Sequence, residues 1–111
     1  MLTHEFIIAA REEAMYEIEY RITREKKMII VPDQLIMNNP KFLKGFETHW
    51  NYIGDIHEGL NYHGITIILD KQLLQFVEVL NCYDQYPYVR DLIDLCNNAV
   101  YRNKCIIHFG I

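Results

Sequence analysis

The sequence predicts a small α+β domain in which a sheet of about three strands packs against four helices, the first of them long. Three observations lead to this fold class. Residues 3–27 contain no glycine or proline, three short apolar runs are typical of strands, and two later stretches repeat apolar residues at helical spacing. With 111 residues, of which 50% are apolar and 23% charged, the chain fits a single compact domain over residues 1–111.

Residues 4–27 are expected to form the long N-terminal helix. Ile8, Met15 and Ile22 recur every seven residues and form one apolar stripe. Acidic residues come early and basic residues late, which matches the helix dipole. A rival interpretation is local, because residues 16–23 alternate apolar and polar side chains as a strand does. The helix is favoured because no residue that breaks helices interrupts the stretch.

The middle of the chain is predicted to contain a strand, a helix and a loop. MIIV, residues 28–31, is a short apolar run ended by a proline, which is typical of a strand. No structure is predicted for PDQLIMNN, which follows. Asn39 and Pro40 can cap and begin a second helix. The buried side of that helix would carry Phe42, Phe46, His49, Trp50 and Ile53. Residues 54–64 contain three glycines and are expected to form a loop or a hairpin.

The C-terminal half has the clearest patterns. ITIIL, residues 65–69, is β-branched at four of five positions and continuously apolar, so a strand at the centre of the sheet is expected. Asp70 can cap a helix whose buried face includes Leu73 and Phe76. Residues 88–102 repeat apolar side chains at helical spacing and predict a fourth helix. KCIIHF, residues 104–109, is interpreted as the last strand.

Charge and composition exclude several classes of protein. The net charge is −4 and the basic residues are scattered, so no direct nucleic-acid partner is expected. No apolar run is long enough to span a bilayer, and the N-terminal stretch lacks the basic leader of a signal peptide, so no membrane association is expected. Cys82, Cys96 and Cys105 form no C-x-x-C pair, which predicts free thiols in a reducing, cytoplasmic location.

The stretch HEGLNYH is the first candidate site. If a three-residue turn begins at Gly59, His57 lies opposite His63, and the two imidazoles could share a metal with His49 or Asp55. Three ligands and an open position would suit a small metal-dependent hydrolase or lyase. A two-residue turn shifts the register and separates the histidines. The glycines favour a turn, and the spacing is not H-E-x-x-H, so the metal site is the minority interpretation.

Catalytic motifs are otherwise lacking in the sequence. The chain contains no serine and no G-x-G phosphate loop, and its cysteines stand among apolar neighbours, which is typical of inert thiols. His108 alternates with Ile107 and Phe109 and is expected to face solvent. We therefore expect no cofactor and do not favour an enzyme.

The second candidate site is NCYDQYPYVRDLID, where tyrosines and acidic residues meet at a corner between two helices. Tyrosines are enriched at protein interfaces because they combine a large rigid area with a polar tip. The predicted partner-binding residues are Tyr83, Asp84, Tyr86, Tyr88 and Asp91. In the competing interpretation, the aspartate is a helix cap and the tyrosines cover the core.

The function favoured by these observations is a non-enzymatic protein-interaction domain. Such a compact acidic protein could be an inhibitor, an immunity-type protein or an adaptor that docks on a basic protein partner. A small-ligand sensor with a pocket near Phe46 and Trp50 is a further alternative. A homodimer is compatible with each of these functions.

Overall fold

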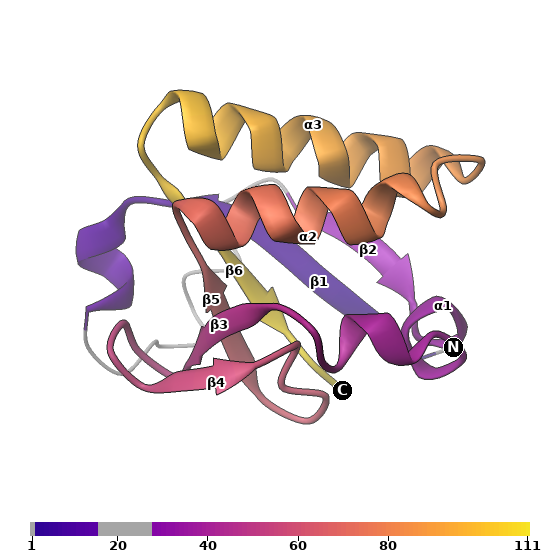
Figure 1. The fold of residues 1–111 in the computed structure, drawn as a ribbon, viewed down its shortest axis with the longest axis horizontal. Coiled ribbons are helices and arrows are strands. Elements are labelled where there is room, and N and C mark those ends of the chain that lie inside the picture. Colours follow the sequence, from indigo (N-terminus) through magenta and orange to yellow (C-terminus); the bar gives the residue numbers. More distant parts are fainter. Residues whose placement is uncertain (1, 16–27) are drawn as a thin grey trace.

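The computed structural model describes residues 2–15 and 28–111, which build one six-stranded antiparallel sheet with two long helices across one face (Figure 1). The strands are β1 (Thr3–Ala9), β2 (Ile29–Pro32), β3 (Glu47–Trp50), β4 (Ile56–Glu58), β5 (Ile65–Ile68) and β6 (Cys105–Phe109). Their order across the sheet is β2-β1-β6-β5-β3-β4. The helices are α1 (Asp33–Met37), α2 (Lys71–Asn81) and α3 (Pro87–Tyr101), and 3-10 turns lie at η1 (Arg11–Ala14) and η3 (Pro40–Phe42).

The three central strands, β1, β6 and β5, are apolar on both faces of the sheet. Because side chains alternate along a strand, Phe6 and Ile106 face the helices, whereas Ile7 and Ile107 face the opposite side. All four are at most 1% exposed. A strand that is covered on both faces reads as a continuous apolar run. This double burial explains the composition of FIIA and CIIHF.

The long helices α2 and α3 lie side by side and antiparallel on one face of the sheet, joined by a short corner (Figure 1). Each helix buries one apolar stripe against the sheet. The buried apolar residues of the two stripes are Leu73, Phe76, Leu80, Val89, Leu92, Cys96 and Ala99. Pro87 occupies the first position of α3, where its missing N–H costs nothing. The corner lies at the same end of the molecule as α1 and the N-terminus.

The predicted long N-terminal helix is wrong. Residues Thr3–Ala9 form β1, which pairs with both β2 and β6, and residues Arg11–Ala14 form only a 3-10 turn. The spacing of Ile8 and Met15 fits a helix, but the run from Phe6 to Ala9 fits a doubly covered strand equally well, and the pairing with two neighbouring strands decides between them. Residues 16–23, where strand and helix patterns compete, lie outside the described residues.

The predicted second helix and the three-stranded sheet are also wrong. After the 3-10 turn at Pro40–Phe42 the chain passes Gly45, which has a φ of +94° that ends helical geometry, and continues as β3. Residues expected on one helical face are therefore divided between the 3-10 turn, a loop and a strand. Residues 54–64, expected to form a loop or a hairpin, contain β4, which pairs with β3 at the edge of the sheet.

Other elements agree with the sequence patterns. The strands expected at 28–31, 65–69 and 104–109 correspond to β2, β5 and β6, and the last two helices correspond to α2 and α3. Strand β5 has neighbours on both sides, as expected of an interior strand. Within the described part of the chain, no helix has both the length and the apolar character needed to cross a bilayer.

Candidate functional site

A pocket of about 590 Å³ opens between the start of β1, helix α1 and the corner that precedes α3. Its walls combine apolar, aromatic and amide side chains. The residues that matter most for its chemistry are Asp33, Asn38, Asn39, Tyr86 and Tyr88. Of the described residues that line it, Asp33 alone carries a formal charge. A largely apolar pocket with a few converging polar groups is the usual form of a binding site.

Asp33 is held firmly at the wall of this pocket. It is the first residue of α1, and its backbone N–H donates to the carbonyl oxygen of Leu2 over 3.1 Å. Its Oδ1 accepts a hydrogen bond from the Tyr62 hydroxyl at 2.6 Å and lies 2.9 Å from Nε2 of His4. The side chain is only 10% exposed. The described residues provide no hydrogen bond to Oδ2, so one carboxylate oxygen remains an open acceptor.

A chain of buried side chains runs from Asp33 into the protein. Nδ1 of His4 lies 2.8 Å from Nε2 of His108, and Nδ1 of His108 lies 3.0 Å from Oγ1 of Thr66. Oγ1 of Thr66 also accepts the backbone N–H of Asn61 at 2.8 Å. The side chains of the two histidines and the threonine belong to the neighbouring strands β1, β6 and β5, on the face that the helices cover, and all three residues are 0% exposed.

The hydrogen bonds of this chain all run in one direction. An ionised carboxylate only accepts, so Nε2 of His4 donates to Asp33, and in the tautomer without a proton on Nδ1 of His4 that atom accepts from Nε2–H of His108. Nδ1 of His108 then accepts from the Thr66 hydroxyl. With both rings neutral, each buried nitrogen has one partner of the right kind. The protons are assigned from this network, as is usual for histidines.

The surroundings fix the charge states along the chain. The Tyr62 and His4 hydrogen bonds lower the pKa of Asp33 below its usual value, against the opposing effect of burial. The bond to Asp33 raises the pKa of the Tyr62 hydroxyl, and burial lowers the pKa of His108 well below 6.5, helped by the neighbouring His4. Burial, then Tyr86, raises the pKa of Tyr88. At neutral pH the pocket therefore presents a fixed carboxylate beside neutral phenols.

This arrangement suits binding of a positive group better than acid–base catalysis. In a hydrolytic triad the histidine faces the substrate and the carboxylate stands behind it. Here the order is reversed, because His4 and His108 are buried and Asp33 faces the pocket. A carboxylate with a lowered pKa is a weak general base. It is, however, a permanent negative charge in a partly desolvated place, where a cation is attracted strongly.

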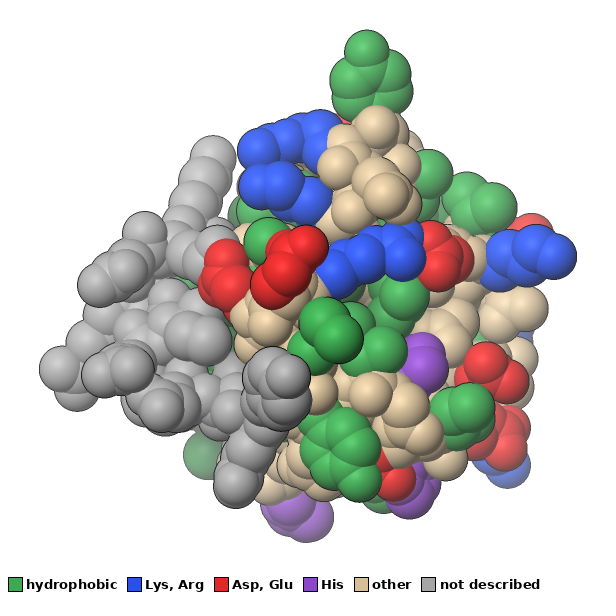
Figure 2. Space-filling model, turned by 90° about the vertical axis from the view of Figure 1, so that its left-hand side faces the viewer, with side chains coloured by type: hydrophobic (Ala, Val, Ile, Leu, Met, Phe, Trp, Pro, Cys, Tyr) green, Lys and Arg blue, Asp and Glu red, His purple; other side chains and the backbone are tan. Residues whose placement is uncertain are grey.

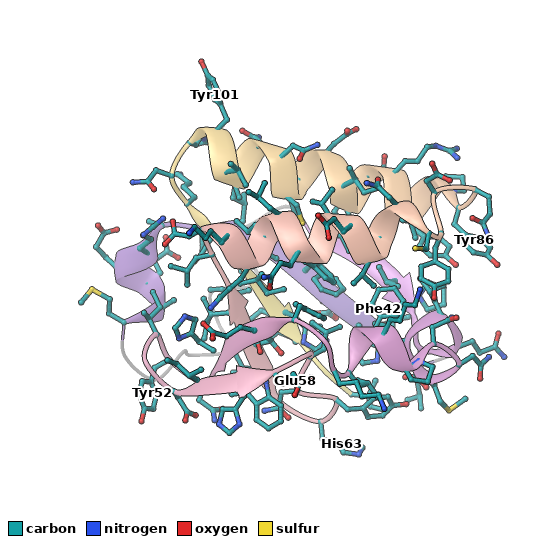
Figure 3. The ribbon with its side chains drawn as sticks, viewed as in Figure 1. Phe42, Tyr52, Glu58, His63, Tyr86 and Tyr101 are labelled. Carbon is teal, nitrogen blue, oxygen red and sulfur yellow. The ribbon has the colours of Figure 1, made fainter. Side chains whose placement is uncertain are left out.

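The predicted partner-binding residues lie around the corner between α2 and α3, beside the pocket (Figure 3). Tyr86 and Tyr88 line the pocket, with ring centroids 5.4 Å apart and planes 14° from parallel. Tyr83 is half-buried and packs on Phe42 at 5.3 Å between centroids, so it belongs to the core edge. Asp84 and Asp91 are exposed and do not line the pocket, and the backbone carbonyl of Asp84 accepts from Arg90.

The histidines of the predicted metal site lie elsewhere, around the β3–β4 edge and the turn before β5. The predicted hairpin register is wrong, because His57 lies opposite Thr48 of β3 rather than opposite His63. His57 stacks on Trp50 at 4.0 Å and contacts Asp55 at 3.1 Å. Across the residues that the structure describes, no three His, Cys, Asp or Glu side chains form a group that could hold a metal ion.

His49 has a structural part on strand β3. Its Nδ1 accepts the backbone N–H of Gly54 at 2.9 Å, and Gln72 lies 3.1 Å from its Nε2. Burial lowers the pKa of His49, against the nearby carboxylates. These contacts fasten the β3–β4 turn to the start of α2.

The region of Phe46 and Trp50 also differs from the expected ligand pocket. Phe46 is 3% exposed and belongs to the core, while the Trp50 indole N–H donates to the carbonyl oxygen of Gly59 at 3.0 Å. A hollow of about 400 Å³ does touch Phe46, together with Glu47, Glu58 and Gln75. It is the smaller and more polar of the two hollows that we describe.

The sequence did not predict the buried hydrogen-bonded series that links Asp33, His4, His108 and Thr66. Asp33 falls in a stretch without a recognisable pattern, and His108 was expected to face solvent, which is wrong because it is 0% exposed. A signal was present in CIIHF. A strand in which all the remaining positions are apolar is covered on both faces, so a histidine within it is buried and needs partners.

Comparisons with known proteins give no match: no family model fits the chain, and neither the curated proteins nor the solved structures include one with significant similarity.

Proposed function

We propose that this chain is a non-enzymatic protein-interaction domain, of the inhibitor, immunity-type or adaptor kind, that docks on a basic surface of a protein partner. The observation that carries the proposal is Asp33, whose nine-tenths buried side chain has a lowered pKa and which lines a pocket together with Tyr86 and Tyr88. We define the docking surface by five residues, Asp33, Asp84, Tyr86, Tyr88 and Asp91. Tyr83, expected at this surface, contributes by supporting its edge.

Exposed apolar side chains at the pocket support docking of a protein. Leu2 and Tyr86 line the pocket and are 61% and 39% exposed, and Met37, which precedes the lining residue Asn38, is 55% exposed. Interfaces gain most of their binding energy from a few aromatic or apolar anchors surrounded by polar residues. The pocket provides such anchors next to a buried charge.

The distribution of charge supports a basic partner. At the end of the molecule away from the pocket, basic side chains stand over the start of α2 and the end of α3, with acidic side chains beside them (Figure 2). Arg11 donates to Asp70 and to Asn103, and these two residues adjoin Lys71, Arg102 and Lys104 in the sequence. The docking surface carries exposed Asp84 and Asp91 beside the Asp33 pocket. Exposed carboxylates at a docking surface orient the approach of a basic protein and raise its association rate.

The fixed geometry of Asp33 also favours tight recognition. Binding normally costs the ordering of flexible side chains, about 0.5–1.5 kcal/mol for each. The hydrogen bonds from Tyr62 and His4 already order this carboxylate. The acceptor is therefore organised before the partner arrives.

The test compares two charge-reversal variants in capture from the source cells followed by kinetic measurement. Asp84→Lys with Asp91→Lys changes the docking surface, and Glu12→Lys with Glu78→Lys changes the net charge equally on exposed residues that do not line the pocket. The candidate partners are the proteins that the Asp84/Asp91 variant fails to capture. The wild type and the Glu12/Glu78 variant must both capture them. Their association rate is then measured against salt.

We expect the Asp84/Asp91 variant to lower the association rate at low salt about tenfold or more, and the matched control to change it by about twofold or less. A partner that both variants bind equally well would overturn the proposal. So would light scattering that shows a dimer of this chain dissociated by the Asp84/Asp91 change, because the docking surface would then be occupied by a second copy.

A further inference from the structure

We infer that the pocket at Asp33 is a binding site for the guanidinium group of an arginine side chain. This inference rests on the proposed function, since it names the group of the basic partner that the pocket would accept. It stands on three features of the pocket: an open carboxylate oxygen, a stacked pair of tyrosines and three side-chain amides among the lining residues.

The open carboxylate oxygen is the anchor. Tyr62 and His4 both occupy Oδ1 of Asp33, and the described residues leave Oδ2 without a hydrogen bond. A carboxylate that is only 10% exposed has lost most of its water. A cationic donor restores that solvation, and its hydrogen bond is about twice as strong as one between neutral groups. No basic residue among the described lining residues already supplies such a donor.

The tyrosine pair favours a planar cation. The rings of Tyr86 and Tyr88 are 14° from parallel, and both residues line the same pocket as Asp33. A cation over an aromatic face gains about 0.5–2 kcal/mol. Guanidinium is planar and weakly hydrated, so it stacks on such rings more readily than the compact, strongly hydrated ammonium of lysine.

The amides of the pocket provide acceptors in addition to the carboxylate. Asn39 uses its Nδ2 to donate to the carbonyl oxygen of Leu35 at 2.6 Å, which leaves its Oδ1 as an acceptor. Gln34 and Asn38 add two exposed amides to the same lining. Guanidinium has five N–H donors in a fixed fork, whereas ammonium has three. A volume of about 590 Å³ accommodates a long side chain inserted from a partner.

Other ligand classes fit less well. An anion would meet the ionised Asp33 without a basic residue among the described lining residues to offset it. A purely apolar ligand would bury that carboxylate without a partner for Oδ2, which is costly. A planar cation satisfies the carboxylate and covers the aromatic surface together.

The test uses N-acetyl-L-arginine methylamide as the probe and N-acetyl-L-citrulline methylamide as its matched control, since citrulline has nearly the same shape without the charge. The full chain is titrated with each compound and followed by amide chemical shifts. We expect saturable shifts at residues 33–39 and 86–88 with arginine, at millimolar affinity, and at least tenfold weaker binding of citrulline. The lysine compound is expected to bind several-fold more weakly than arginine.

Two variants extend the test. Asp33→Asn should abolish the arginine shifts, while Tyr86→Leu, at an exposed position that leaves the buried chain intact, should weaken binding several-fold. Equal binding of arginine and citrulline by the wild type, or shifts outside the pocket, would overturn the inference even if Asp33→Asn fails to fold. If arginine does not bind but the Asp84/Asp91 variant still loses its partner, this inference fails and the proposed function stands. If arginine binds as expected but the Asp84/Asp91 variant keeps its partner, the proposed function alone fails.

Discussion

Nε2 of His4 lies 2.9 Å from Oδ1 of Asp33, and this contact connects a fully buried histidine with the one formal charge on the described lining of the pocket. The contact has two effects. It holds the carboxylate in one orientation, and it begins the series of hydrogen bonds that continues through His108 to Thr66. The Asp33 carboxylate is therefore organised by residues at the centre of the sheet.

Replacing Thr66 by valine should destabilise the protein by about 1–3 kcal/mol, because Nδ1 of His108 and the backbone N–H of Asn61 would both lose their buried partner. The free energy of unfolding is measured by urea denaturation. Thr3→Val is the matched control, since Thr3 is half-buried at the start of β1 and its side chain has no hydrogen bond with the described residues. Equal effects of the two substitutions would show that the hydrogen bonds of Thr66 in the buried series contribute no stability.

The stability of the protein should fall as the pH falls below about 6.5. Burial lowers the pKa of His108 well below 6.5, so this ring is neutral when folded and takes up a proton when unfolded. The unfolded state then binds more protons, and each such group lowers the free energy of unfolding by up to about 1.4 kcal/mol per pH unit below 6.5. Asp33, whose pKa is also lowered, adds a loss only below about 3.8.

The variant that checks this pH dependence is His108→Gln, which keeps a donor and an acceptor but does not titrate. Its unfolding free energy should change less between pH 7 and pH 5 than that of the wild type. A smaller dependence of the unfolding free energy on pH should remain in this variant, because burial also lowers the pKa of His49. Gln75→Asn, an exposed substitution on α2 that changes no titrating group, is the control and should leave the slope of the wild type unchanged. An unaltered slope in His108→Gln would contradict the prediction.

One thiol should react much faster than the other two under native conditions. Cys82 is exposed after the end of α2, whereas Cys96 and Cys105 are buried, and burial raises the pKa of Cys96. The thiolate is the reactive form, so both burial and the raised pKa protect Cys96. Mass spectrometry after brief treatment with a thiol reagent should find one label per chain. Cys82→Ser should remove it, and rapid labelling of this variant would refute the assignment.

The sequence predicts those elements of the fold whose local pattern has one interpretation. ITIIL is both β-branched and continuously apolar, and residues 88–102 have a clear helical period, so β5 and α3 were recognisable. Thr3–Ala9 and Glu47–Trp50 were not, because their apolar spacing also fits a helix. What makes them strands is pairing with β6 and β5, which lie far away in the sequence. Such long-range pairing leaves little trace in a local pattern.

Only those residues of the candidate site that stand in a recognisable local pattern were predictable from the sequence. Tyr86 and Tyr88 could be singled out because they stand together at a corner between two recognisable helices. Asp33 could not, since its role depends on His4, Tyr62 and a strand order that no local pattern reveals. His108 was recognisable as buried once its strand was treated as covered on both faces.

Gly59 should be among the least replaceable residues of the chain. Its φ is +70°, its N–H donates to the carbonyl oxygen of Phe46 at 2.8 Å, and a Cβ there would collide with the backbone of Leu43. Backbone atoms cannot rotate away as a flexible side chain can, so the whole β4–β5 connection would have to shift. We expect Gly59→Ala to lower the free energy of unfolding by about 3 kcal/mol or more.

The matched control for Gly59 is Gly54→Ala in the turn between β3 and β4. Gly54 also has a positive φ, +114°, but a Cβ there meets no atom within 4 Å, so only the backbone strain of about 1–3 kcal/mol remains. Thermal and urea unfolding of the two variants measure the difference. Because Thr48 and Trp50 both donate to the carbonyl oxygen of Gly59, the fluorescence of Trp50 should change in the first variant and not in the second. Equal destabilisation would show that Gly59 is held by its φ alone and that the contact with Leu43 adds nothing.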